Sequence, residues 1–154
     1  MATKCAINGR QWGAYDGRRQ YRQLGYALAS APHGLIRTAR QAGWSTEGCE
    51  QLAAHVRIVD ALVVNPEVPD AAVVRAALIE RLIAELTDDM AGNGRLYGST
   101  EDLPERVQFW RELGFEVREP NTPTTWEHPG CRTLRYSGES PGCRQFTRTL
   151  GGPL

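Results

Sequence analysis

The residues best suited to bind a metal lie near the C-terminus. His128, Cys131 and Cys143 could supply three zinc ligands, since imidazole and thiolate are the side chains that zinc prefers. The spacing is loose and a fourth ligand is missing, so reduced, structural thiols are the favoured interpretation for all four cysteines of the chain. The remaining histidines, His33 and His55, stand alone, and no Ser/His/Asp triad can be argued from the spacings.

The elements that must position any site centre on residues 58–119. Residues 58–64 form a nearly continuous apolar, β-branched run, which is typical of a strand buried on both faces and is ended by Pro66. Asp70 is a predicted N-cap for a helix whose apolar residues recur at three- and four-residue spacing: Val74, Ala77, Leu78, Leu82 and Leu86. A turn at 92–94 then leads to a predicted strand over 95–99.

A second helix and strand complete this unit. Asp102 followed by Glu105 resembles a capping box, and the stripe Leu103, Val107, Trp110, Leu113 predicts a helix in which Trp110 is buried. Gly114 stands where a helix end needs a left-handed residue, and a strand starts at 115. The predicted order is β-α-β-α-β, with the first strand central and separating from its neighbour near Pro66.

These residues resemble the core of the GNAT N-acetyltransferase superfamily. The family pattern has a strand ending in V-x-P-x, a pyrophosphate loop, a helix with L-L-x-x-L, a strand, and a helix ending in F-Y-x-x-L-G-F. The chain has Val64-Asn65-Pro66-Glu67, then Leu78, Leu82 and Leu86, then Phe109-Trp110-Arg111-Glu112-Leu113-Gly114-Phe115. The resemblance implies a single α/β domain with a GNAT-like mixed sheet flanked by helices, residues 1–154. Residues 1–45 would be a basic N-terminal part, and residues 120–154 a loop-rich C-terminal hairpin.

The resemblance also implies a function. It predicts acyl transfer from acetyl-CoA, or another acyl-CoA, to an amine or nucleobase acceptor. Asp60 on the central strand stands where family members can place a general base, and Tyr97 on the next strand is a candidate for the acid. The implied cofactor contacts come from the strand end and the start of the helix: Val63, Val64, Ala72, Val73 and Val74.

The chain departs from the family at two chemical positions. The family loop Q/R-x-x-G-x-G/A binds pyrophosphate through backbone N–H groups at a helix N-terminus. Here Pro69, Ala72 and Val74 replace its Q/R and its glycines, Asp70 adds a negative charge, and Trp110 replaces the family's tyrosine acid. We therefore expect residues 68–74 to bind acetyl-CoA weakly, on the millimolar scale, or about −4 kcal/mol.

Charge and patterning add expectations for the flanks. The chain has zero formal net charge, but residues 1–43 carry seven basic residues against Asp16 alone, so this part is +6 and the remainder −6. A basic face with tyrosines can bind nucleic acid, although a solvated face over core aromatics is the favoured interpretation. We expect a helix near 17–29, a strand or short helix at 35–42, a helix cap at 45–47, and a strand at 132–136 paired with 115–118. No run is long enough to span a membrane and no signal sequence follows Met1, so a cytoplasmic location is expected.

Two alternatives remain open at this stage. One is a non-catalytic GNAT-like protein that serves binding or assembly. The other is a glyoxalase/bleomycin-resistance-like module, which residues 99–117 also resemble, with Glu127 and His128 as the available ligands. The sequence does not identify the acceptor or the oligomeric state.

Overall fold

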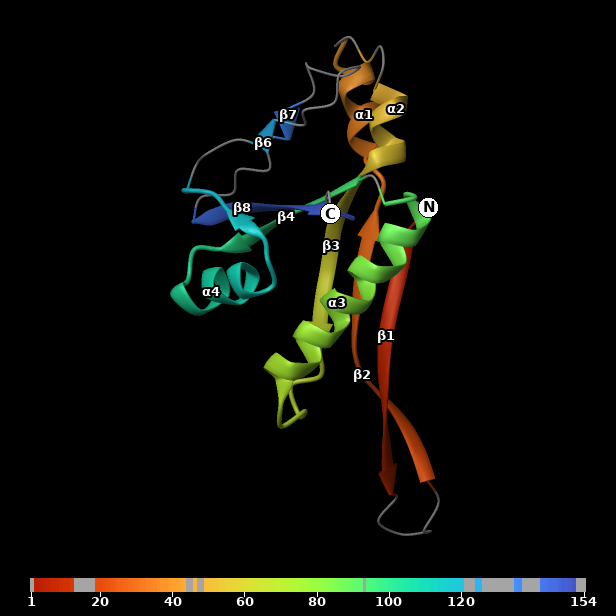
Figure 1. Cartoon of the computed structure of the whole chain (residues 1–154), viewed down its shortest axis with the longest axis vertical. Coiled ribbons are helices and arrows are strands. Elements are labelled where there is room, and N and C mark those ends of the chain that lie inside the picture. The colour runs from red at the N-terminus through yellow and green to blue at the C-terminus, as the bar shows by residue number, and fades with distance from the viewer. Residues whose placement is uncertain are drawn as a thin grey trace.

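The computed structural model describes residues 2–12, 19–43, 46, 49–92, 94–120, 124–125, 135–136 and 142–151. In these ranges a mixed six-stranded sheet has the order β1-β2-β3-β4-β8-β5, and β6 and β7 form a separate two-stranded sheet (Figure 1). The strands are β1 (Ala2–Trp12), β2 (Arg19–Ser30), β3 (Val56–Val64), β4 (Gly94–Glu101), β5 (Glu116–Val117), β6 (Thr124–Thr125), β7 (Arg135–Tyr136) and β8 (Cys143–Leu150). The helices are α1 (His33–Gln41), α2 (Cys49–His55), α3 (Ala71–Asp89) and α4 (Pro104–Glu112).

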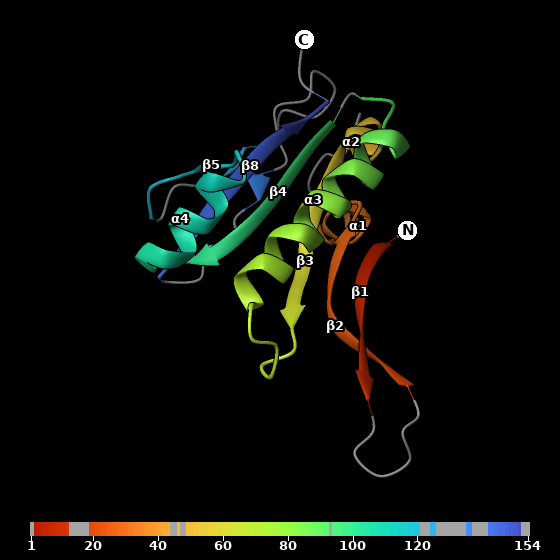
Figure 2. The same ribbon diagram turned by 60° about the horizontal axis from the view of Figure 1, so that its bottom comes forward.

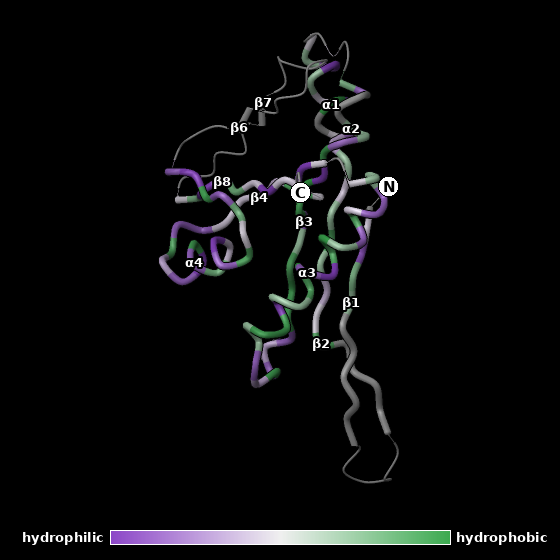
Figure 3. Tube along the Cα trace, viewed as in Figure 1, coloured by the Kyte–Doolittle hydropathy of each residue, from purple (hydrophilic) through white to green (hydrophobic). Residues whose placement is uncertain are grey.

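The predicted central unit is confirmed as β3-α3-β4-α4-β5. β3 lies between β2 and β4, and Figure 3 shows it as a largely hydrophobic trace. Gly114 has φ +82°, which is the left-handed conformation expected after α4. The capping box is not formed, because Leu103 is the N-cap of α4 and the Asp102 carboxylate accepts a hydrogen bond from Arg144 instead.

β3 and β4 are parallel and pair over a short stretch only. Three residue pairs join them, ending at Ile58 and Tyr97, whereas β2 stays paired with β3 as far as Val64. The two strands therefore separate from Val59 onward, earlier than the predicted point near Pro66. Among the described residues, no strand pairs with this edge of β3 beyond Ile58, and the site described below lies there.

The N-terminal third differs from the prediction of a helix at 17–29. Residues 19–30 form β2, which pairs antiparallel with both β1 and β3. The alternation of β2 explains the difference, because Ala27 and Ala29 are buried while Tyr26 and Leu28 are less so. Residues 35–42, left open between strand and helix, lie in helix α1 and the residue after it.

The C-terminal pairing also differs from the prediction. β5 pairs with β8 rather than with residues 132–136, and β7 pairs with β6. β8 pairs with β4 along its whole length, so it enters the sheet between β4 and β5. β8 thus takes the place beside β5 that was expected for residues 132–136.

Two clusters of buried side chains hold the faces of the sheet. The larger joins α3 and α4 to one face, and Figure 2 shows both helices on that side. It includes Leu78, Leu82, Leu96, Trp110 and Phe146. The smaller joins α1 and α2 to the start of β3 and to β4, through residues that include Ile36, Ala53, Ile58 and Tyr97.

Candidate functional site

A cavity of about 570 Å³ lies where β3 and β4 separate. Strand residues 59–62 and 99–101 line it, together with side chains of α3, α4 and β8. The helix and β8 residues are Ala72, Arg75, Glu105, Arg106, Phe109, Trp110 and Phe146. The cavity exists because the strands lose their hydrogen bonds after Ile58 and Tyr97, so it follows directly from the short parallel pairing.

The lining residues come from both faces of the sheet. Along β4, Leu96 belongs to the α3/α4 cluster and Tyr97 to the α1/α2 cluster. Because side chains alternate along a strand, Ser99 and Glu101 share the face of Tyr97, and both are exposed. The cavity therefore has a helix side, which holds Arg75 and Arg106, and an opposite side.

Asp60 is positioned by an irregularity in β3. Leu28 of β2 pairs with Ala61 and Ala29 pairs with Val59, so Asp60 is an extra residue between two paired ones. Such bulges bend a strand and redirect a side chain, and they are common beside functional sites. Asp60 is exposed and lines the cavity, while its neighbour Val59 packs on the α3/α4 cluster.

The other predicted acid–base residue lies elsewhere. Tyr97 is 1% exposed within the α1/α2 cluster, and it is not among the described residues that line the cavity. Tyr97 pairs with Ile58, and this is the last residue pair before β3 and β4 separate. The structure thus brings Asp60 but not Tyr97 to the cavity wall.

Of the five residues predicted to contact the cofactor, some lie at the cavity and others do not. Ala72 lines the cavity. Val64 and Val74 pack against the α3/α4 cluster, whereas Val63 and Val73 are 43% and 68% exposed. Only one of the five therefore faces the cavity, in the first turn of α3.

The loop before α3 is a short turn that ends in a charged N-cap. The backbone N–H of Val68 donates to the Asn65 carbonyl, and the N–H of Glu67 donates to the Asn65 side chain. Asp70 is the N-cap, as predicted, but its side chain makes no capping hydrogen bond. Asp70 is exposed, and its negative charge lies at the N-terminal end of α3.

Trp110 is buried, as predicted, and forms part of the cavity wall. Its ring stacks on Phe146 with centroids 4.0 Å apart, and it meets Phe109 and Phe115 edge-on at 5.1 Å. Gly98 makes room for this arrangement, because a Cβ there would lie 2.2 Å from the Phe146 ring. The indole that replaces the family's tyrosine is therefore fixed by aromatic packing.

Sequence reasoning missed several residues of the cavity wall: Arg75, Ser99, Glu101, Glu105 and Arg106. Arg75 stands three residues after Ala72, so it shares the same helix face. Ser99 and Glu101 follow Tyr97 at the two-residue spacing of a strand face. These spacings were visible in the sequence, but which face would meet a cavity was not.

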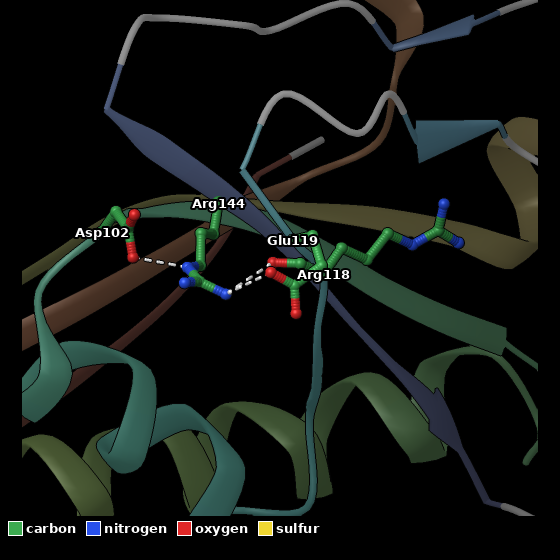
Figure 4. A network of polar contacts seen from close by, with 4 residues as sticks. All are labelled: Asp102, Arg118, Glu119 and Arg144. Atoms are coloured by element: carbon green, nitrogen blue, oxygen red, sulfur yellow. Dashed lines mark hydrogen bonds and ion pairs between the residues drawn. The ribbon is translucent and has the colours of Figure 1, made fainter.

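Arg144 fixes the strand end that supports the α4 wall. Figure 4 shows its guanidinium between two carboxylates, Asp102 at the end of β4 and Glu119 after β5. Arg144 is on β8 and its side chain is 18% exposed, so the contacts join three segments at one point. They hold the connection from β4 to α4 against β8.

The cysteines differ from the prediction of four free thiols. Cys5 and Cys143 are free, but Cys49 is disulfide-bonded. Cys5 donates a hydrogen bond to Glu85 (3.2 Å), and burial together with this contact raises the pKa of Cys5 to about 11. A thiol held protonated in this way is a structural group rather than a nucleophile.

Two other hypotheses rest on residues that the structure does not describe. His128 and Cys131 of the zinc hypothesis lie outside the described residues, and within those ranges no group of three or more potential ligands could hold a metal. For the nucleic-acid hypothesis, the side chains of Arg18, Arg19 and Arg22 in the basic N-terminal segment also lie outside the described residues. Among the described helices, none combines the length and apolar character needed to cross a membrane.

Comparison with solved structures identifies the fold. No protein-family model and no curated protein matches the chain. An aminoglycoside 6'-acetyltransferase type Ii matches with a TM-score of 0.50 at 16% identity, over 96% of this chain and 69% of that one. The ribosomal-protein-S18-alanine N-acetyltransferase from Escherichia coli reaches 0.49 at 13% identity, over 99% and 96%.

At these identities the likeness concerns the fold alone. It agrees with the fold class that the sequence resemblance implied, an α/β fold with a mixed sheet flanked by helices. It does not favour the glyoxalase/bleomycin-resistance alternative. The chain is a mixed-sheet α/β protein with the fold of the GNAT N-acetyltransferases.

Proposed function

We propose that this protein transfers an acyl group from an acyl-CoA thioester to a small amine. The observation that carries the proposal is the cavity between the separated strands, which is open along the β4-facing edge of β3. A protein that only binds a ligand could share this cavity, but the carboxylate of Asp60 in its wall favours catalysis.

The residues of the cavity fit an acyl-pantetheine arm. Within the described ranges, the backbone N–H and C=O groups of β3 beyond Ile58 have no partner strand on the β4 side, and the amides of the arm could pair with such an edge. The aromatic wall of Phe109, Trp110 and Phe146 supplies apolar surface. The phosphate end fits the loop poorly, because glycines are absent and Asp70 is negative.

Asp60 is the side chain to which we assign proton transfer. A bound acyl-CoA supplies an activated thioester carbonyl for attack by the amine. The Asp60 carboxylate, at the cavity wall, would accept the proton that the attacking nitrogen loses. We assign no catalytic role to Tyr97, since it is buried away from the cavity wall.

The acceptor enters, in this proposal, from the side of Asp60, Ser99 and Glu101. Two carboxylates on that side attract a protonated amine and repel the phosphates of a nucleic acid. A small amine is therefore favoured over a nucleobase within a polynucleotide.

Thiol release from acetyl-CoA, measured over a panel of primary amines, tests the proposal. Asp60→Asn should lower kcat by about 10²–10⁴-fold, the usual contribution of a general base. Glu80→Gln, an exposed carboxylate on α3 away from the cavity lining, is the matched control and should leave the rate unchanged. If the unmodified protein neither binds acetyl-CoA nor releases thiol with any amine, the proposal is wrong.

A further inference from the structure

Two arginines face the same cavity from different helices. Arg75 lies one turn after Ala72 on α3, and Arg106 lies in the first turn of α4, one turn before Phe109. Within the described part of the chain, neither guanidinium has an ion-pair partner. Two cations without a neutralising contact thus stand on the helix side of one cavity.

The remaining charges of the wall are separated by face. Asp60 and Glu101 come from the strands, and Glu101 points to the face opposite α3 and α4. On the helix side, Glu105 is the one carboxylate among the described lining residues, set against Arg75 and Arg106. The helix side therefore carries a net positive charge, and the opposite side a negative one.

The loop that would bind phosphate through its backbone is unsuited to that task. Asp70 places a negative charge at the N-cap of α3, and this charge repels an anion even though its side chain makes no capping hydrogen bond. The nearest side chain in the cavity wall is Ala72, at a position where glycine would permit close approach. A phosphate at this end of the cavity needs another source of positive charge.

We infer that Arg75 and Arg106 bind the phosphate groups of the acyl donor from two neighbouring helices of the cavity wall, in place of the backbone N–H groups of the loop. Guanidinium groups bind phosphate oxygens through paired, charge-assisted hydrogen bonds and need no glycine-rich backbone. The inference rests on the proposed function and specifies how its donor is recognised. It also predicts that Glu105, which lies beside Arg106, weakens the binding of an anion.

Calorimetry with two donors separates phosphate contacts from the rest of the site. Acetyl-CoA carries phosphates, whereas acetyl-pantetheine carries none and retains the acyl arm. Arg75→Gln and Arg106→Gln should each raise the Kd for acetyl-CoA roughly tenfold to a hundredfold, the range for a hydrogen bond to a charged group. The Kd for acetyl-pantetheine should stay within about twofold of the unmodified value.

Two further variants sharpen the test. Arg111→Gln removes an exposed arginine of α4 that does not line the cavity, so the Kd for acetyl-CoA should not change beyond a general salt effect. Glu105→Gln removes the carboxylate beside Arg106 and should tighten acetyl-CoA binding severalfold. Circular dichroism melts of each variant check that the helices remain folded.

The outcomes distinguish this inference from the proposed function. If acetyl-CoA binds and both arginine variants bind it as tightly as the unmodified protein, the inference is overturned and the proposed function stands. Equal losses for acetyl-CoA and acetyl-pantetheine also overturn it, because they show a damaged cavity rather than a lost phosphate contact. If the unmodified protein binds neither donor, the proposed function itself fails.

Discussion

Trp110 packs in the core at a position where the related family has a tyrosine that can act as an acid. It stands where the family resemblance places a tyrosine acid, but its indole is 6% exposed and stacked on Phe146. Trp110→Ala should therefore lower the free energy of unfolding by about 3–5 kcal/mol. Thermal and denaturant melts measure this change in stability. Leu103→Ala, at the exposed N-cap residue of the same helix, is the control. A Trp110→Ala melt that matches the unmodified protein would mean that the ring contributes little to the core.

Because of Cys5, the free energy of unfolding should depend on pH in the alkaline range. Its burial and its hydrogen bond to Glu85 raise its pKa from 9.0 to about 11, although Arg81 near Glu85 opposes the shift. The folded state therefore holds the thiol proton more tightly than the unfolded state. The resulting stabilisation is fully present below pH 9 and is lost as the pH rises through about 11. Between pH 8 and 11 the unmodified protein should lose roughly 1–3 kcal/mol that Cys5→Ala does not lose.

Denaturant titrations at a series of pH values measure this difference. Cys143→Ala removes the other free thiol of the described residues and leaves Glu85 untouched, so it should keep the pH dependence of the unmodified protein. Parallel curves for Cys5→Ala and the unmodified protein would show that Cys5 does not carry the effect.

Tyr97 was predicted to be the catalytic acid, but the structure does not place it at the cavity wall. A general acid should cost about 10²–10⁴-fold in kcat when its hydroxyl is removed. Because Tyr97 packs in the α1/α2 cluster, Tyr97→Phe should change kcat less than tenfold, and Tyr97→Ala should mainly reduce stability. A large loss of kcat in a fully folded Tyr97→Phe protein would restore the catalytic interpretation.

At the scale of the element, we expect the loop before α3 to limit the affinity for acetyl-CoA. Asp70→Gly, Ala72→Gly and Val74→Gly together should remove the negative charge and open the backbone, so calorimetry should show tighter binding of acetyl-CoA than the millimolar scale predicted for the native loop. Each glycine within the helix costs about 1 kcal/mol of helix stability. Ala84→Gly, an exposed site on α3, controls for that cost and should leave the affinity unchanged. Unchanged affinity in the triple variant would show that the loop is not what limits donor binding.

The helices and strands could be predicted where the local sequence pattern favours the same structure that the folded protein adopts. The apolar run of β3, the apolar repeat of α3 and the glycine after α4 each have one favourable local structure, and each was confirmed. The prediction failed at β2, because residues 17–29 were expected to form a helix and residues 19–30 form a strand. Pairing with two neighbours decides that segment, and such pairing depends on residues distant in sequence.

At the scale of the whole molecule, the sheet is two paired halves joined by a short parallel contact. β1, β2 and β3 form one half, and β4, β8 and β5 the other. The contact runs from Val56 to Ile58 on β3, and the α1/α2 cluster packs on it through Val56 and Ile58 themselves. The cavity lies where this contact ends, so its existence depends on how far the two halves pair and not on any single motif.

The sequence alone determined the central β-α-β-α-β unit, the burial of Trp110 and the presence of Asp60 on the central strand, because these follow from periodicity and from turn residues close in the chain. Only the tertiary structure decided which side chains share the cavity. Arg75 and Arg106 are 31 residues apart in number, and they meet one cavity because α3 and α4 pack on the same face. Likewise, the insertion of β8 between β4 and β5 depends on hydrogen bonds between distant segments, which local propensity does not encode.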